Sequence, residues 1–252
     1  MITLKSKREI ELLKEAGHIV YLTHQYLRPH IKAGIKTKEL DSLAEKFIRS
    51  KGATPSFKGY EGFPSTLCIS INDEVVHGFP SERVLKEGDI ISIDIGACYK
   101  GYHGDSAWTY TVGEVSDDAK YLLEHTEKAL YEGIKQAKVG NRIGDISYAV
   151  EKYATEHNLG VVKELVGHGV GTSVHESPDV PNYGTKGTGP KIRDGMVIAI
   201  EPMLTLGSPD IYVEDNDWTI KTEDSSLSAH FEHTIAITNE GVIILTGEWK
   251  NG

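Results

Sequence analysis

Residues 85–94 read LKEGDIISID, and residues 192–201, about 107 positions later, read IRDGMVIAIE. Each segment combines a charged turn containing glycine, an apolar strand and an acid at its tenth position. A buried carboxylate is costly unless a cation or hydrogen bonds compensate it. Two such acids, supplied by two related half-domains, therefore predict a shared positive centre between the halves. A metal ion is the simplest candidate for that centre.

Other segments repeat in the same order. The short sequences KAG (32–34), EL (39–40) and EKF (45–47) align with KVG (138–140), DI (145–146) and EKY (151–153) at an offset of 106. HGD at 103–105 matches HFE at 230–232, and VHG at 76–78 matches GHG at 167–169. Chance similarity of two amphipathic helices would explain the helices alone, but not the shared order of helix, turn, strand and acid. We predict one domain over residues 1–252, with half-repeats at about 5–112 and 116–246.

Composition narrows the class of protein. A chain of 252 residues is long enough for one large core. Its net charge of −10 argues against nucleic-acid binding through a broad basic face. No apolar run approaches the length of a membrane span, and the first 17 residues lack the apolar core of a signal peptide. Two cysteines cannot form a disulfide framework. We expect a cytoplasmic monomer.

The apolar periodicity predicts alternating helix pairs and strands. Helices are expected at about 6–30, 37–52, 116–139 and 144–158. Strands are expected at 67–71, with a turn at 72–73, and at 90–95 and 103–112, joined by a hairpin turn at 100–101. Residues 176–195 read as a long functional connection. This order predicts an α+β fold with an antiparallel sheet covered by helices on one face.

Five side chains are candidate metal ligands: Asp94, Asp105, His168, Glu201 and Glu232. Four carboxylates and an imidazole suit Mn, Fe(II), Co or Zn better than a metal that prefers thiolates. They exceed the three protein ligands common at one catalytic zinc, and they fit two ions bridged by carboxylates. Alternatively, Asp105 stabilises a turn, and Glu201 forms a cap or a salt bridge before Pro202. The paired repeat positions favour metal binding.

Three histidines near glycine or proline are candidates for function. His168 lies in GHGVG, where the glycines would let backbone and metal approach closely. His77 and His175 are not needed as ligands, so they could hydrogen-bond a substrate carbonyl and the developing oxyanion. Six further histidines are interpreted as surface or structural groups; they are His18, His24, His30, His125, His157 and His233.

Five motifs together resemble those of the type I methionine aminopeptidases, metallopeptidases with the pita-bread fold. They are NDEVVHGFP (72–80), Asp94 with HGDSAWT (103–109), GHGVG (167–171), AIEPM (199–203) and FEHTI (231–235). The likeness runs from about residue 4 to residue 247. It implies duplicated halves around a dinuclear site, and removal of the N-terminal methionine from nascent chains, including chains still at the ribosome.

The resemblance also implies individual roles. Asp94 would chelate one metal ion, Asp105 and Glu232 would bridge two, and His168 and Glu201 would complete the other site. Glu201 would in addition move a proton. His77 and His175 match the substrate-contacting histidines of that family. Asn72 and Ser228 match positions that can hold a monovalent cation.

Tyr60, Phe63, Cys68 and Trp218 are expected to line a closed apolar slot for the methionine side chain, although Tyr60 and Phe63 could instead anchor a loop to the core. Phe63 stands where tyrosine is frequent in the family, which affects pocket polarity. A floor formed by His77 and His175 would admit only a small second residue. The chain shows neither the N-terminal zinc-binding extension of eukaryotic type I enzymes nor the helical insertion of type II, so a bacterial-like form is expected.

Two other classes share this fold. An Xaa-Pro aminopeptidase or prolidase usually carries an extra N-terminal domain, whereas this chain starts with the first repeat helix. Non-catalytic binding proteins, and creatinase-like hydrolases, lose part of the ligand set, whereas all five ligand positions are filled here. Methionine aminopeptidase is therefore the preferred function.

Overall fold

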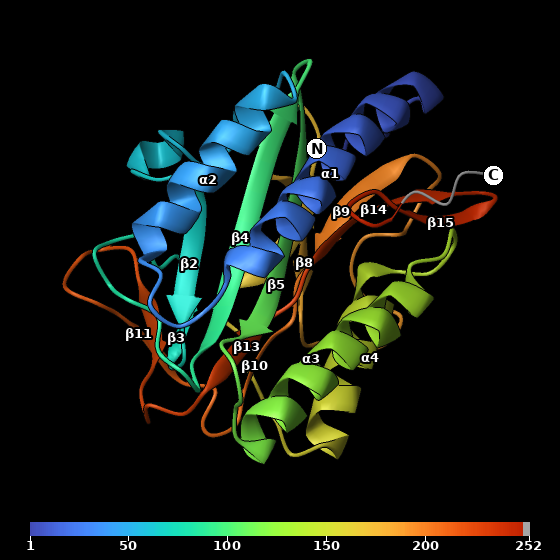
Figure 1. The fold of residues 1–252 in the computed structure, drawn as a ribbon. Helices are drawn as coiled ribbons and strands as arrows, with labels where there is room; N and C mark the ends of the chain where they lie inside the picture. Colours follow the sequence, from blue (N-terminus) through green and yellow to red (C-terminus); the bar gives the residue numbers. More distant parts are fainter. Residues whose placement is uncertain (249–252) are drawn as a thin grey trace.

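The first half of the chain forms an antiparallel sheet covered by two helices (Figure 1). The computed structural model describes residues 1–248. The central strand β4 (Ile90–Tyr99) pairs with β5 (Tyr102–Thr111) on one side. On its other side lie β2 (Leu67–Ile71) and the short β1 (Thr54–Pro55). The covering helices are α1 (Lys7–Leu27) and α2 (Thr37–Ser50), followed by 3₁₀ turns at Arg28–His30 and Tyr60–Gly62.

Alternation of side chains along β4 places one predicted ligand opposite the helices. Ile91, Ile93 and Ile95 are buried in one cluster with residues of α1 and α2. Successive side chains of a strand point to opposite faces, so Asp94 points away from that cluster. The predicted strand at 90–95 was too short. The strand continues to Tyr99 because β5 pairs with it along its whole length.

The second half forms a five-stranded sheet in the order β15-β14-β9-β7-β8. Its strands are β7 (Val166–Gly169), β8 (Glu176–Pro181), β9 (Met196–Ile200), β14 (His233–Thr238) and β15 (Gly241–Ile244). The helices α3 (Asp117–Gln136) and α4 (Ile143–Glu156) pack against it through Leu130, Ile146 and Ile198, among others. The expectation of an irregular connection at 176–195 was wrong at its start, where β8 forms. This strand lies at the sheet edge, where its prolines are tolerated.

Two small antiparallel sheets complete the fold. One has the order β13-β10-β6 and the other the order β11-β12-β3. Their strands are β3 (Glu74–Val76), β6 (Gly160–Val161), β10 (Met203–Thr205), β11 (Ile211–Val213), β12 (Ile220–Thr222) and β13 (Ser228–His230). The pairing of β12 with β3 therefore joins a strand of the second half to a strand of the first.

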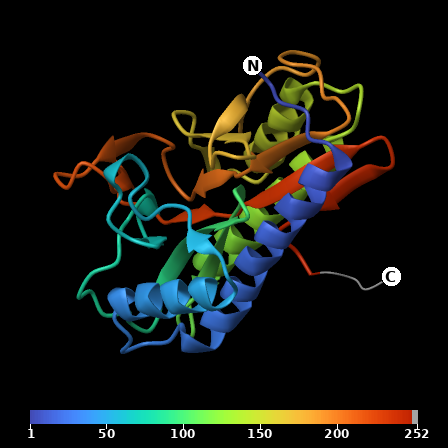
Figure 2. The same ribbon diagram turned by 90° about the horizontal axis from the view of Figure 1, so that it is seen from above.

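Helix α1 also spans both halves, as Figure 2 shows. Its first turns bury Ile10 and Leu13 with residues of β9 and β14, while its later turns bury Ile19 and Val20 with the first sheet. Gly17 is required at the crossing, since a Cβ there would lie 2.5 Å from the Leu245 carbonyl oxygen. The N-terminal segment is thereby held against the second sheet.

The predicted fold class is confirmed: helices cover antiparallel sheets in an α+β arrangement. The predicted 100–101 turn forms with positive φ at Lys100 and Gly101, as a tight hairpin requires. Helix ends differ from the predictions by a few residues, most at the C-terminal ends of α1 and α3, which lie at Leu27 and Gln136. Within residues 1–248, no helix combines the length and apolar character needed to cross a membrane.

Candidate metal centre and substrate pocket

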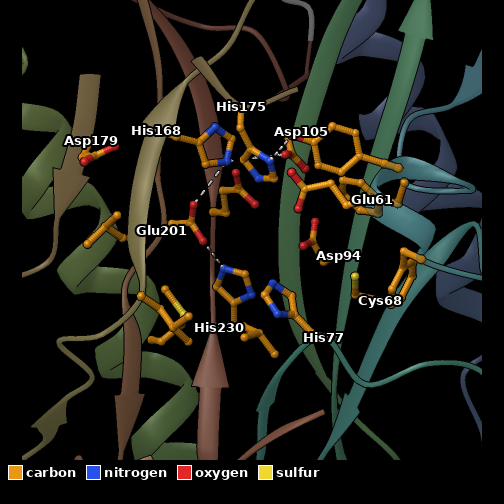
Figure 3. A pocket seen from close by; sticks show the side chains of 18 of the residues that line it. Glu61, Cys68, His77, Asp94, Asp105, His168, His175, Asp179, Glu201 and His230 are labelled. Atoms are coloured by element: carbon orange, nitrogen blue, oxygen red, sulfur yellow. Dashed lines mark hydrogen bonds and ion pairs between the residues drawn. The ribbon is translucent and has the colours of Figure 1, made fainter. Parts of the chain in front are cut away.

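A cavity of about 550 Å³ opens between the two halves, and all five predicted ligands line it (Figure 3). Asp94 and Asp105 come from the neighbouring strands β4 and β5. His168 comes from β7, Glu201 directly follows β9, and Glu232 lies between β13 and β14. Pairing of β4 with β5, and of β9 with β7 and β14, thus delivers ligands from both halves to one place.

The ligand atoms are close enough to share ions. His168 Nε2 lies 3.4 Å from Glu201 Oε1 and 3.7 Å from Asp105 Oδ2. Two ligand groups, Asp94–Asp105–Glu232 and His168–Glu201–Glu232, each have donor atoms within 4.8 Å of one another. Asp105, His168 and His175 form a third such group. Glu232 belongs to the first two groups and Asp105 to the first and third, so each of these carboxylates belongs to more than one group of potential ligands.

Three of the four carboxylates each bury an oxygen that no protein group compensates. Within residues 1–248, Asp94 Oδ1, Asp105 Oδ1 and Glu232 Oε1 are buried and have no hydrogen-bond partner. Burial raises the pKa of Asp94 and of Glu201 to about 7. For Asp105 and Glu232, burial and then the neighbouring carboxylates raise the pKa well above its usual range. Buried polar groups normally find partners, so these oxygens indicate an external cation.

This donor set fits divalent metal ions. Carboxylate oxygens and one imidazole nitrogen are ligands for Mn, Fe, Co or Zn. His168 Nδ1 lies 2.9 Å from the Gly169 carbonyl oxygen, which leaves Nε2 directed at Glu201 and Asp105. A backbone partner of this kind fixes the tautomer that a metal requires.

The glycines around His168 let neighbouring strands approach closely. A Cβ at Gly167 would lie 2.4 Å from the Ala199 carbonyl oxygen, and a Cβ at Gly169 would lie 2.4 Å from that of Ser177. They therefore let β7 fit between β8 and β9, and the predicted close approach of a metal stays a prediction. Close strand packing is what aims His168 into the cavity.

The four predicted slot residues lie together on one side of the cavity. Tyr60, Phe63, Cys68 and Trp218 belong to one apolar cluster, which also contains Val174. The rings of Phe63 and Trp218 meet edge to face at 5.2 Å between centroids. Cys68 is the strand neighbour of Asp94 in the β2–β4 register, so the slot adjoins the ligand cluster. Burial raises the pKa of the Cys68 thiol well above its usual value, so Cys68 contributes a neutral apolar surface.

His77 and His175 both line the cavity. His77 has φ of 59°, a conformation that is uncommon outside glycine and often found at functional sites. His175 Nδ1 lies 3.2 Å from the Tyr60 hydroxyl, and its ring centroid lies 4.2 Å from that of His168. Burial lowers the pKa of His77 to about 4 and lowers that of His175. Both imidazoles are therefore neutral near pH 7 and can each donate one hydrogen bond.

The sequence reasoning missed His230 as a cavity residue. His230 Nε2 is buried without a hydrogen-bond partner and lies 3.4 Å from Glu201 Oε2. It also lines the cavity beside His77. The alignment of HFE (230–232) with HGD (103–105) placed this histidine next to a ligand, which was the available signal.

Asn72 and Ser228 lie side by side, with the Ser228 amide donating to the Asn72 carbonyl oxygen at 2.9 Å. Their side chains already have protein partners: Asn72 bonds to Asp89 and the Ile90 amide, and Ser228 to the Leu204 carbonyl oxygen. A monovalent cation here stays a prediction.

Comparison with known proteins agrees with the geometry. The model of metallopeptidase family M24 matches residues 11–239. Methionine aminopeptidase 1 of Bacillus subtilis is 56% identical over 246 residues, which cover 98% of this chain and 99% of that protein. The crystal structure of methionine aminopeptidase from Thermotoga maritima has a TM-score of 0.97 at 43% identity and covers 98% of this chain and 100% of that one. Xaa-Pro dipeptidase from Bacillus anthracis has a TM-score of 0.76 at 26% identity and covers 98% of this chain but 63% of that one.

Proposed function

The chain belongs to metallopeptidase family M24, and we propose that it removes the N-terminal methionine from polypeptides whose second residue is small and uncharged. The observation that carries this proposal is the convergence of buried carboxylates, three of them with an oxygen unpaired within residues 1–248, beside an apolar cluster. Full-length similarity to methionine aminopeptidases supports it, and the weaker identity to an Xaa-Pro dipeptidase favours it over the rival peptidase.

Two divalent ions would be held by the five side chains in the family's pattern. Asp94 would chelate one ion, His168 and Glu201 would hold the other, and Asp105 with Glu232 would bridge them. When bound, such ions act as Lewis acids and lower the pKa of water. Which of Co, Mn, Fe(II) or Zn serves in the cell depends on availability as much as on ligand type.

Side chains around the cluster would handle protons and orient the scissile carbonyl. Glu201 lines the cavity with Oε1 at 3.4 Å from His168 Nε2, and a carboxylate in this place would accept and return a proton during the reaction. His175 and His77 reach the same cavity as neutral imidazoles. They would donate hydrogen bonds to the carbonyl oxygen and to the negative charge that develops on it.

The slot formed by Tyr60, Phe63, Cys68 and Trp218 would bind the methionine side chain. Sulfur packs favourably against aromatic rings, and an unbranched chain adapts to a narrow slot. Asp94 borders both slot and ligand cluster and would read the free α-amino group, so acylated termini should be refused. The histidine pair would restrict the second residue to Gly, Ala or Ser.

Further proposals follow from the same function. The substrates would be nascent chains in the cytoplasm, met at the ribosome, and the enzyme would act as a monomeric single domain of two related halves. A monovalent cation at Asn72 and Ser228 would stabilise the contact between the two halves at the point where the Ser228 amide donates to the Asn72 carbonyl oxygen.

A peptide series tests the proposed function. Matched Met-Ala, Met-Gly, Met-Lys and Ala-Pro peptides would be incubated with the metal-loaded protein, and the metal content would be measured on the same sample. We expect rapid release of methionine before Ala and Gly and almost none before Lys. Equal rates for Met-Ala and Met-Lys, or preferential cleavage of Ala-Pro, would overturn the assignment.

A further inference from the structure

A buried ion pair joins the start of the chain to the loop that carries His175. Lys5 Nζ lies 2.5 Å from Glu176 Oε2, and the two side chains are 4% and 17% exposed. In every other lysine or arginine ion pair of residues 1–248, the cation is at least 20% exposed. Exposed pairs contribute little, whereas a buried charge that loses its partner is strongly unfavourable. Lys5 and Glu176 are therefore tightly linked.

The second oxygen of Glu176 organises the loop that precedes it. Glu176 Oε1 accepts hydrogen bonds from the Thr172 amide at 2.8 Å and the Ser173 amide at 3.2 Å. Gly171 lies so close to this carboxylate that a Cβ there would be 2.2 Å from Oε1. The backbone of residues 171–173 is thus folded around a single carboxylate.

This loop forms one wall of the substrate cavity. Val174 is buried in the apolar cluster with Phe63 and Cys68. His175 follows it and contacts Tyr60 and His168. The neighbouring Gly171 carbonyl oxygen accepts a hydrogen bond from the His103 amide, which links the loop to the first half. Fixing residues 171–176 therefore fixes His175 relative to the ligand cluster.

Lys5 is itself firmly held. Its amide donates to the Gly195 carbonyl oxygen at 2.7 Å, and a Cβ at Gly195 would lie 2.6 Å from the Lys5 carbonyl oxygen. Gly195 belongs to the turn that leads into β9 and on to Glu201. The Lys5 backbone is thus anchored beside the segment that leads to Glu201. Its ammonium group reaches the Glu176 carboxylate, which shapes the loop that carries His175.

We propose that Lys5 and Glu176 are positioning residues for His175, with the Lys5 ammonium holding the Glu176 carboxylate and, through it, the loop. The proposal rests on the proposed peptidase function for its kinetic consequences only. Without the Lys5 charge, the loop should loosen and His175 should leave its position against the carbonyl. Turnover should fall, while the metal ligands and the methionine slot are retained.

The test compares Lys5→Met with Lys5→Arg, which keeps the charge, and with Glu176→Gln, which keeps an acceptor but removes the charge. Lys36→Met is the matched control, since Lys36 forms an exposed ion pair with Glu82. On a Met-Ala peptide we expect Lys5→Met and Glu176→Gln to lower kcat by about 10- to 100-fold, the scale of a small misplacement, with little change in KM or metal content. Lys5→Arg should recover most of the loss, and Lys36→Met should behave as wild type.

Two further measurements separate positioning from general destabilisation. Adding Lys5→Met to His175→Ala should cause no further loss of kcat, because the residue being positioned is already gone. Hydrogen exchange of the Thr172 and Ser173 amides should accelerate in Lys5→Met but not in Lys36→Met, and this readout needs no activity. If the wild-type protein fails to cleave the peptide, the proposed function is wrong. Hydrogen exchange then decides alone whether Lys5 holds the loop in place. Wild-type kcat per folded molecule, a full additive loss in the double variant, or unchanged exchange would overturn the proposal. Should Lys5→Met not fold, Glu176→Gln decides by the same criteria.

Discussion

The protein buries polar side chains in two adjoining regions. In one region they have hydrogen-bond partners, and in the other several of their oxygens do not. Behind the central strands, His24 has Tyr110 and the Ser106 carbonyl oxygen as partners of its two ring nitrogens. His233 has Thr246 and Tyr131. In the cavity, Asp94, Asp105 and Glu232 each bury an oxygen without a partner.

The two regions meet at two consecutive residues, Glu232 and His233. Glu232 lines the metal cavity, while the next residue, His233, lines a separate cavity with Trp108 and Tyr131. The same backbone therefore presents a satisfied group on one side and an unsatisfied one on the other. Satisfied groups stabilise the fold, whereas unsatisfied ones indicate a bound species that completes them. The comparison teaches that a buried polar side chain does not by itself indicate a binding site, whereas a buried polar side chain without a hydrogen-bond partner does.

The largest expected difference concerns metal removal. Exhaustive chelation should abolish cleavage of a Met-Ala peptide, because the cavity carboxylates converge and three of them bury an oxygen that has no hydrogen-bond partner within residues 1–248. Added Mn, Co or Fe(II) should restore activity and release protons, since the carboxyl groups must ionise to bind metal. Far-UV circular dichroism should stay unchanged, because the satisfied region needs no metal. Full turnover by the metal-free protein would show that the unpartnered cavity carboxylates do not mark a metal site needed for activity.

A substitution within the unsatisfied region should affect activity more than stability. Glu201→Gln should lower kcat by about 10²–10⁴-fold, the range for loss of a general acid or base. The metal-free variant should be at least as stable as wild type, because one buried charge is removed from a crowded cluster. Steady-state kinetics and thermal melting check both points, with the exposed Glu240→Gln as control. A large loss of stability with normal kcat would show that Glu201 serves the fold and not the reaction.

The two regions also differ in how far the sequence could predict them. The convergence of the five candidate ligands on one cavity could be predicted because a repeated pattern and family motifs bear on the same five residues. His230 was missed because its role depends on a tertiary approach to Glu201 that no local spacing encodes. The Lys5–Glu176 pair, 171 positions apart, left no signal for the same reason.

Fold predictions failed where tertiary pairing overrode local pattern. The apolar run at 90–95 marks the buried part of β4, but pairing with β5 extends the strand to Tyr99. The prolines at 178 and 181 suggested a loop, yet an edge strand tolerates them, and β8 forms there. The interpretation of His24 and His233 as satisfied structural groups agrees with their hydrogen bonds.

Within the satisfied region, a substitution should affect stability and leave catalysis intact. His24→Gln cannot reproduce both imidazole contacts, so the Tyr110 hydroxyl or the Ser106 carbonyl oxygen loses its partner. An unsatisfied buried group costs about 1–3 kcal/mol. Denaturant unfolding should show that loss, while kcat per folded molecule on a Met-Ala peptide stays within about twofold of wild type, less than the tenfold change that 1.4 kcal/mol of barrier would produce. A kcat loss comparable to that of Glu201→Gln would show that the two regions are not separable.

The smallest expected effect is a pH dependence that belongs to the satisfied region alone. Burial lowers the pKa of His24 from 6.5 to about 4. Below pH 6.5 the unfolded chain therefore binds a proton that the native His24 excludes, so the contribution of His24 to wild-type stability falls as the pH decreases towards 4. Between pH 6.5 and 5.5 this costs about 1 kcal/mol. Glutamine does not titrate, so the stability advantage of metal-free wild type over metal-free His24→Gln should shrink by that amount across this range. The cavity acids are common to both proteins and cancel in the difference. An advantage that stays constant, or grows on acidification, would mean that native His24 accepts the proton as readily as the unfolded chain.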